Sequence, residues 1–204
     1  MTAPKSTLAA LTGGVACGKS TVAAILHGAG VGICDADRLA REALAPGTPG
    51  AAEVKRRFGP GVVGPDGEID RDALRRQVLA DPAARKELET IVHPRVRAAW
   101  QAWADGCRRD GRRGAVVIPL LFEVGADRED WTAIVCVAAP ETAQRERLAR
   151  RGWTETEIDA VLAAQWPLET KMKRSDHVIW NDGTLEDLNQ TVLALAGRIW
   201  KETP

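Results

Sequence analysis

The chain has 204 residues, and its 28 basic side chains balance 28 acidic ones, so the formal net charge is +0. This balance argues against binding nucleic acid through bulk charge, which needs an excess of Lys and Arg. No apolar run approaches the roughly 20 residues of a membrane-spanning helix, and Met1–Ser6 has no signal-peptide apolar region. The four cysteines lack metal-binding spacing. We therefore expect a cytoplasmic protein with reduced thiols and no nucleic-acid or membrane partner.

A glycine-rich segment follows the first apolar run, Leu8–Leu11, and matches the pattern G-x-x-x-x-G-K-[ST] of a phosphate-binding loop. A helical pattern follows, so the loop lies between a strand and a helix, as this motif requires. Backbone N–H groups of such a loop point at phosphate oxygens, and the helix N-terminus adds positive potential. We expect Lys19 to contact the β- and γ-phosphates and the Ser20 hydroxyl to ligate Mg²⁺. The predicted nucleotide-binding residues are Gly13, Gly14, Val15, Ala16, Cys17, Gly18, Lys19, Ser20 and Thr21.

Two carboxylates, Asp35 and Asp37, end the next predicted strand, which covers residues 31–37. Ligands bind at the carboxyl ends of strands in an open parallel sheet. Both carboxylates would therefore lie near the phosphate loop if this strand neighbours the first. Their alternative role is to cap the helix that is predicted to begin at Asp37.

Residues 51–105 are predicted to be helical and to form an insertion between the second and third strands. Asp70 or Asp72 is expected to cap one of these helices, and Asp81-Pro82 begins another. We expect that second helix to break at His93-Pro94 and to resume beyond it, because proline lacks the N–H of a helix interior.

The remaining strands and helices alternate. Near-continuous apolar runs at 114–123 and 131–140 predict strands that are covered on both faces, the first ending near Pro119. Helices are predicted at 141–151, 154–165 and 184–199, with a last short strand at 175–181. Five strands alternating with helices predict a three-layer α/β fold around a five-stranded parallel sheet.

A phosphate loop alone does not separate kinases from GTPases, ATPases and nucleic-acid motors. The chain has no N-K-x-D guanine signature, its third strand ends without an acidic pair, and it is short for a motor. A small-molecule phosphotransferase remains. Such an enzyme needs a carboxylate for the acceptor hydroxyl and cationic side chains for the transferring phosphoryl group. Asp35 and Asp37 are candidates for the first role, and the basic helix Arg145–Gly152 for the second.

The chain resembles the dephospho-CoA kinases over nearly its whole length. The more specific shared segments are Asp35-Ala36-Asp37, His93-Pro94 and Pro119-Leu120-Leu121-Phe122-Glu123. Further shared positions are Gln144, Arg147, Gln165, Asp176 and Asn181. The resemblance implies a P-loop kinase fold with a lid, which uses ATP and Mg²⁺ to phosphorylate the ribose 3′-hydroxyl of dephospho-CoA.

The resemblance also implies a division of the chain. Residues 1–50 and 106–204 form the nucleotide-binding core, with a lid at about 141–175, and residues 51–105 form the helical substrate-binding insertion. The implied catalytic residues are Asp37 as the base, Lys19 and Arg147. Weaker expectations for substrate binding fall on Asp35, His93, Glu123, Arg150 and Arg151. Of the two adjacent arginines, one is expected to be functional and the other to be a solvated helix charge.

Two positions in the loop depart from the family pattern, which usually has Gly and Ser where this chain has Ala16 and Cys17. We expect Ala16 to adopt a backbone conformation that does not need glycine. The helix N-terminus and Lys19 favour thiolate, so we expect Cys17 to be more reactive than a free cysteine. Its alternative is a thiol that points away from the loop.

Two other functions remain open from the sequence. One is a different P-loop kinase that acts on a nucleoside or nucleoside monophosphate. The other is an ATP-binding regulatory module that has lost the transfer reaction. The oligomeric state is left open.

Overall fold

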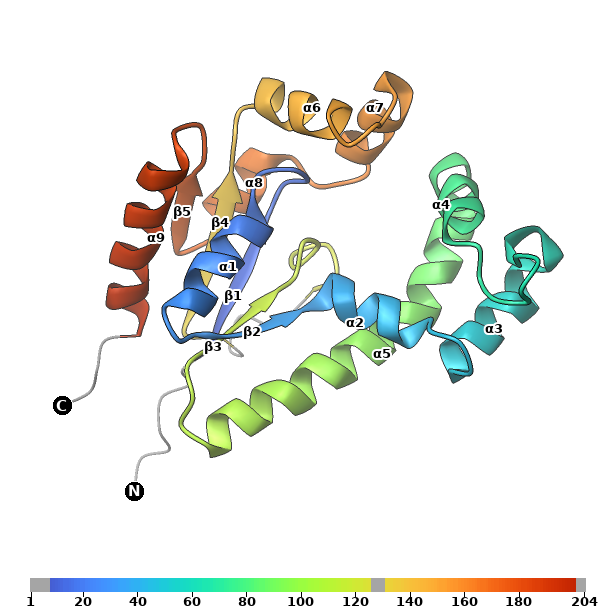
Figure 1. Ribbon diagram of the computed structural model, residues 1–204, viewed down its shortest axis with the longest axis horizontal. Helices are drawn as coiled ribbons and strands as arrows, with labels where there is room; N and C mark the ends of the chain where they lie inside the picture. The colour runs from blue at the N-terminus through green and yellow to red at the C-terminus, as the bar shows by residue number, and fades with distance from the viewer. Residues whose placement is uncertain (1–7, 126–130, 201–204) are drawn as a thin grey trace. The chain divides into compact units, whose positions relative to one another are not determined.

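The computed structural model describes residues 8–125 and 131–200, and it contains a five-stranded parallel sheet (Figure 1). The strand order is β2-β3-β1-β4-β5, which places β1 at the centre. The strands are β1 (Leu8–Gly13), β2 (Gly32–Asp35), β3 (Gly114–Val117), β4 (Ala133–Ala138) and β5 (His177–Trp180). Every residue of β1, β3 and β4 is buried, which explains their near-continuous apolar sequences. The predicted fold class is confirmed.

Helices alternate with these strands along the chain. Their bounds are α1 (Lys19–Gly28), α2 (Ala36–Ala43), α3 (Pro49–Phe58), the 3₁₀ turn η1 (Pro60–Val62), α4 (Arg71–Ala80), α5 (Pro82–Arg109), α6 (Glu141–Ala149), α7 (Glu155–Ala163), α8 (Leu168–Lys173) and α9 (Leu185–Ile199). Capping side chains lie at the start of several of these helices. Asp70 caps α4 through the N–H groups of residues 72 and 73, and Thr154 and Thr184 form capping boxes at α7 and α9.

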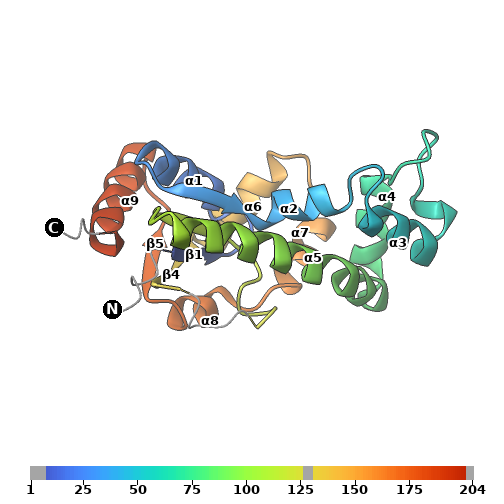
Figure 2. The ribbon, with the colours of Figure 1, turned by 90° about the horizontal axis from the view of Figure 1, so that it is seen from below.

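Helices cover both faces of the sheet. In Figure 2, α1 and α9 lie on one face and α8 on the other. The main apolar core joins α1 and α9 to alternate strand residues such as Leu11, Val135 and Ile179. On the opposite face, a Cβ added at Gly114 would lie 2.9 Å from the ring of Trp103, near the end of α5. The close approach of this helix therefore requires glycine at the start of β3.

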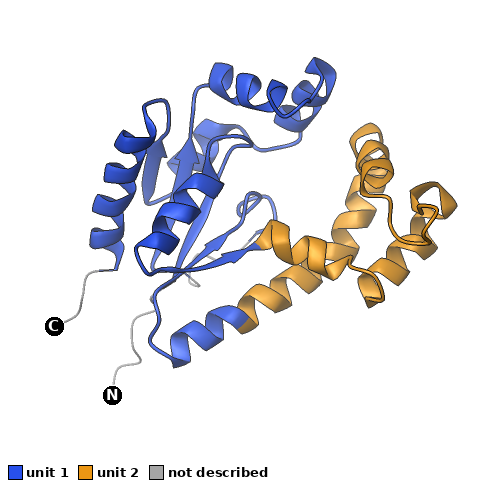
Figure 3. Ribbon diagram, viewed as in Figure 1, with its two compact units in different colours: residues 1–35, 103–204 blue, residues 36–102 orange. Residues whose placement is uncertain are grey.

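The chain divides into two compact units (Figure 3). The first holds residues 1–35 and 103–204, and with them the whole sheet. The second holds residues 36–102 and has its own core, built from Val54, Val62, Leu74 and Ile91. It begins earlier than the predicted insertion at 51–105, because β2 ends at Asp35 and α2 begins at Ala36. Asp37 consequently lies in the first turn of a helix rather than at the end of a strand, which corrects the strand predicted for residues 31–37.

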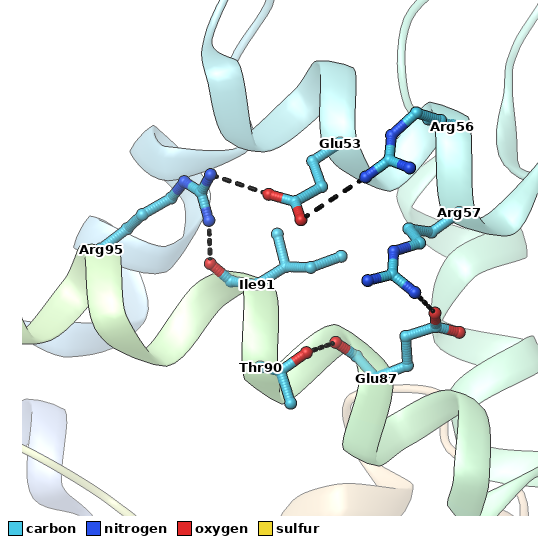
Figure 4. Close-up of polar contacts among 7 residues, drawn as sticks. All are labelled: Glu53, Arg56, Arg57, Glu87, Thr90, Ile91 and Arg95. Carbon is cyan, nitrogen blue, oxygen red and sulfur yellow. Dashed lines mark hydrogen bonds and ion pairs between the residues drawn. The ribbon is translucent and has the colours of Figure 1, made fainter.

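The predicted break at His93-Pro94 is wrong, because α5 runs through Pro94 without interruption. Proline there removes the N–H that would bond the carbonyl of Thr90. The next carbonyl, that of Ile91, accepts a hydrogen bond from the Arg95 guanidinium (Figure 4). Arg95 also donates to Glu53 of α3 at 2.9 Å. Arg95 therefore contacts the helix at the carbonyl next to the one whose backbone bond Pro94 removes.

A second ion pair joins the same two helices on the other side of Pro94. Arg57 of α3 donates to Glu87 of α5 at 2.8 Å (Figure 4). Both members are partly exposed, so neither pair adds much to the free energy of unfolding on its own. Buried Ile91 and Val92 lie between the two pairs. Packing within the second unit thus overrides the helix-breaking preference of proline.

Candidate active site

The phosphate loop connects β1 to α1 and depends on two glycines. Gly13 has a φ of +137°, and an added Cβ would lie 2.0 Å from the carbonyl oxygen of Val137 on β4. Gly18 has a φ of +102°, and an added Cβ would lie 2.2 Å from the side-chain nitrogen of Asn181. A side chain is therefore excluded at both positions by backbone conformation and by space.

Lys19 opens α1 and folds back over the loop. Its ammonium group donates to the carbonyl oxygens of Gly13 at 3.0 Å and Gly14 at 2.7 Å. The helix has no acidic residue in its first turn and no side-chain cap from Gly18. The first N–H groups of a helix have no partner within it, so this end of α1 carries uncompensated positive potential. The arrangement suits an anion such as a phosphate group.

A pocket of about 250 Å³ opens beside this end of α1. It is lined by Ala16, Gly18, Ser20, Thr21, Arg147, Arg151, Asn181, Gly183, Leu185 and Leu188. Two guanidinium groups and the hydroxyl of Ser20 make one part of the wall polar. Leu185, which is 67% exposed, and Leu188 make another part apolar. The pocket therefore offers cationic and polar groups on one part of its wall and apolar side chains on another.

Arg147 and Asn181 hold the loop from the pocket side. The Arg147 guanidinium donates to the carbonyl of Ala16 at 3.0 Å and to that of Asn181 at 3.1 Å. The Asn181 side chain in turn donates to the carbonyl of Cys17 at 2.8 Å. The sequence prediction included Arg147, whereas Asn181 was only a position shared with the family. Its buried amide between β5 and α9 could not be located without the tertiary structure.

The basic helix does not act as one cationic surface. Arg145 bonds the acidic side chains of Glu141, Glu155 and Asp159 at 2.9, 3.2 and 2.6 Å. Arg150 has a side chain that is 78% exposed and lies 3.5 Å from Glu146. Only Arg147 and Arg151 of this segment line the pocket. The structure thus places two of the candidate arginines, Arg147 and Arg151, at the pocket and leaves Arg150 on the exposed surface.

Ala16 was expected to adopt a backbone conformation that does not need glycine, and this expectation is wrong. Its φ is +56°, and it is the one non-glycine residue with a positive φ in the part of the chain that the structure describes. This left-handed conformation costs an L-residue about 1–2 kcal/mol. Ala16 is buried and packs with Leu148 of α6 and Ile158 of α7. Burial against these helices offsets part of the backbone strain.

The expectation of a reactive Cys17 is also wrong. Its side chain is 0% exposed, and burial raises the pKa of its thiol despite the nearby charges of Lys19 and Arg147. The sulfur points into the base of the loop, where a Cβ on Gly14 would lie 2.8 Å from it. Burial also raises the pKa of Cys136 to about 11. The thiol therefore behaves as a small apolar group.

We expect alkylation of Cys17 in the native protein to be no faster than that of buried Cys107. The raised pKa lowers the thiolate fraction at any pH below it, and burial blocks the reagent. Mass spectrometry of iodoacetamide-treated protein measures both rates, with the guanidinium-unfolded chain as the control in which both thiols are accessible. Preferential labelling of Cys17 in the native protein would contradict this expectation.

The other predicted residues have separate locations. Asp35 ends β2, in register with Val117 of β3, at the same edge of the sheet as the phosphate loop. Asp37 is exposed in the first turn of α2, and His93 is half-buried on α5; both belong to the second unit. Glu123 instead makes internal contacts, with the ammonium of Lys171 at 2.7 Å and the backbone N–H of Trp166 at 3.0 Å.

Within residues 8–125 and 131–200, none of the helices has both the length and the apolar composition that a membrane crossing requires.

Comparisons with known proteins agree with this geometry. A family model described as dephospho-CoA kinase matches residues 7–187. A dephospho-CoA kinase of Anaeromyxobacter dehalogenans is 49% identical over 180 residues, which cover 87% of this chain and 85% of that protein. A crystal structure from Thermus thermophilus has a TM-score of 0.76 at 37% identity, covering 95% of this chain and 97% of the other. A dephospho-CoA kinase structure from Campylobacter jejuni has a TM-score of 0.71 at 26% identity, covering 95% and 96%.

Proposed function

Because this chain belongs to the dephospho-CoA kinase family, we propose that it transfers the γ-phosphoryl group of ATP to the ribose 3′-hydroxyl of dephospho-CoA. The products are coenzyme A and ADP. The observation that carries this proposal is the phosphate loop, over which Lys19 is held, together with the adjoining pocket that Arg147 and Arg151 line beside the N-terminus of α1. Cationic groups and helix N-terminal N–H groups are the parts that phosphoryl transfer uses.

ATP is proposed to bind in the pocket of about 250 Å³. Its phosphates would lie against the N-terminus of α1 and the ammonium of Lys19. Its base would lie against the apolar wall at Leu185. The guanidinium groups of Arg147 and Arg151 would stabilise charge on the transferring group.

Mg²⁺ is proposed to be held at the hydroxyl of Ser20. This hydroxyl is exposed, lines the pocket and is an oxygen donor of the kind that Mg²⁺ prefers. Mg²⁺ often keeps several waters and phosphate oxygens as ligands, so a single protein oxygen fits the requirement. When bound, the ion neutralises charge on the phosphates.

Asp37 is proposed as the general base. Its carboxylate would accept the proton of the 3′-hydroxyl as the new O–P bond forms and the β–γ bridge bond breaks, the electron pair leaving with ADP. The support is its exposure in the first turn of α2, two residues after the end of β2 at the ligand edge of the sheet. Asp35 is proposed to support this carboxylate or the water shell of the metal.

The second unit is proposed to bind the remainder of dephospho-CoA, with His93 as a candidate contact. The support is the family resemblance of the His93-Pro94 segment and the separate helical core of this unit.

None of the four cysteines, all of which the structure describes, forms a disulfide. This is typical of proteins in reducing compartments, and we propose that the enzyme acts in the cytoplasm.

A product assay tests the function. ADP release is measured with ATP alone and with dephospho-CoA, adenosine or AMP as acceptor, and the phosphorylated product is identified by mass spectrometry. We expect dephospho-CoA to be much the best acceptor. Preference for adenosine or AMP would indicate another P-loop kinase. ATP binding without transfer to any acceptor would indicate a regulatory module.

Substitution of the two adjacent arginines separates their roles. Arg151→Ala removes a charged group from the pocket wall, so we expect KM for ATP to rise or kcat to fall by about ten-fold, the effect of one charge-assisted hydrogen bond. Arg150→Ala is the matched control, because its exposed pairing with Glu146 leaves it outside the pocket. Steady-state kinetics of both variants decide the point. A larger defect in Arg150→Ala would reverse the assignment.

A further inference from the structure

The segment between α7 and α8 contacts the phosphate loop at a residue that does not line the pocket. The side-chain oxygen of Gln165 accepts a hydrogen bond from the backbone N–H of Val15 at 3.1 Å. Leu168 packs near Gly14, where an added Cβ would lie 3.5 Å from its side chain. Val15 is not among the residues that line the pocket. Its N–H is therefore bonded to Gln165 rather than directed at the nucleotide position.

An ion pair anchors this segment to the loop that follows β3. The ammonium of Lys171 is 0% exposed and donates to Glu123 at 2.7 Å and to the carbonyl of Pro119 at 2.9 Å. The same Glu123 oxygen accepts the backbone N–H of Trp166 at 3.0 Å. A buried charge needs such partners. Glu123 thus fixes the backbone of the residue that directly follows Gln165.

A further contact fixes the same two segments. The guanidinium of Arg174, just after α8, lies 5.3 Å from the ring centroid of Phe122 and 5.4 Å from that of Trp166. Both distances are within the range of a cation–π interaction. Three contacts therefore attach residues 165–174 to residues 119–123. They are the backbone hydrogen bond of Trp166 to Glu123, the ion pair of Lys171 with Glu123, and the contact of Arg174 with the ring of Phe122.

The phosphate loop needs external support at this point. Ala16, the neighbour of Val15, has a strained φ of +56°. Such a conformation persists only where the surroundings determine it. The carbonyl of the peptide that carries the Val15 N–H, that of Gly14, accepts bonds from Lys19 at 2.7 Å and from the Cys17 N–H at 3.3 Å. Without Gln165, the N–H of Val15 would lose its partner, and this peptide would be held from its carbonyl side alone. The direction of the N–H groups of the next residues would then be less tightly fixed.

We propose that Glu123 and Lys171 are positioning residues that hold Gln165 against Val15 and so keep the phosphate loop in its nucleotide-binding shape. This rests on the proposed function only in taking the loop as the ATP site. Buried ion pairs are weak sources of stability. The role assigned here is geometric: it acts through Gln165 on nucleotide affinity and leaves the affinity for the acceptor unchanged.

A double-mutant cycle on the whole protein tests the proposal. The variants are Gln165→Ala, Glu123→Gln and both together, and the readouts are Kd for Mg-ATP by calorimetry, KM for dephospho-CoA, and Tm. We expect each single variant to raise Kd by about ten-fold, as loss of one hydrogen bond does. The double variant should bind Mg-ATP with the same Kd as the more weakly binding single variant, because both changes act through one contact. KM for dephospho-CoA should stay unchanged.

Glu169→Gln is the matched control. It breaks an exposed pair with Lys173 on the same helix α8, in which the side chains are 75% and 73% exposed, and we expect Kd to stay unchanged. If Glu123→Gln does not fold, the paired variant Glu123→Gln/Lys171→Met replaces it in the cycle, since it leaves no buried charge unpaired. The proposal would be overturned if the effects of the two single substitutions on Kd multiply in the double variant, or if Kd is unchanged in Gln165→Ala. Normal ATP binding by the wild type without transfer to dephospho-CoA would contradict the proposed function instead.

Discussion

Replacing Lys19 by alanine is expected to lower kcat by about 10²–10³-fold, the usual effect of removing one group that stabilises charge in the transition state. The ammonium is held over the loop by the carbonyls of Gly13 and Gly14 at 3.0 and 2.7 Å. Its position is therefore fixed before nucleotide binds, as those of Arg147 and Asn181 are by their own bonds to loop carbonyls. Steady-state kinetics with both substrates saturating measure the loss.

The control for this variant is Lys173→Ala, which removes an exposed lysine paired with Glu169. It should keep normal kcat and Tm. Because Lys19 also bonds two loop carbonyls, Kd for Mg-ATP is measured beside kcat, to separate a disordered loop from a lost charge. Near-normal turnover in Lys19→Ala would remove this residue from the mechanism.

The second large effect is expected from Asp37→Asn, which should lower kcat by roughly 10²–10⁴-fold, the range of a general-base contribution. The amide keeps the size of the side chain but cannot accept the proton of the acceptor hydroxyl. Asp37 is exposed in the first turn of α2, so we expect Tm and Kd for Mg-ATP to stay near the wild-type values.

Asp35→Asn is the companion variant, with a smaller expected loss because Asp35 ends β2 and is proposed only to support the base. The two variants are compared in the same assay, with Kd for Mg-ATP and Tm measured beside kcat. An inactive Asp35→Asn beside an active Asp37→Asn would exchange the two assignments.

Sequence alone predicted the features that depend on local patterns. The strand–loop–helix around Gly13–Thr21 follows from spacing, and the helices predicted to begin at residues 154 and 184 begin at Glu155 and Leu185, directly after the N-caps Thr154 and Thr184. Strand positions followed from apolar runs that are long enough to be covered on both faces. In each case the interacting residues are close in sequence or the pattern repeats.

The errors have a common physical origin in contacts between distant parts of the chain. The continuity of α5 through Pro94 is accompanied by packing of Ile91 in the core of the second unit and by the contact of Arg95 with Glu53 of another helix. The raised pKa of the Cys17 thiol results from burial, whereas its sequence context gave only the nearby charges, which lower it. The sequence left Arg150 and Arg151 as alternatives, because only the tertiary structure shows that Arg151 lines the pocket and Arg150 does not. No local pattern carries this information.

The two loop glycines differ in how the chain could tolerate their replacement. The obstacle at Gly18 is the side chain of Asn181, which a second substitution can shorten, so that only the strain of its φ of +102° would remain. The obstacle at Gly13 is the main-chain oxygen of Val137, which every residue type on β4 would retain. No compensating mutation at position 137 can therefore rescue a change at Gly13. In a library selected for function, position 18 can covary with position 181, whereas position 13 should stay glycine in every sequence background.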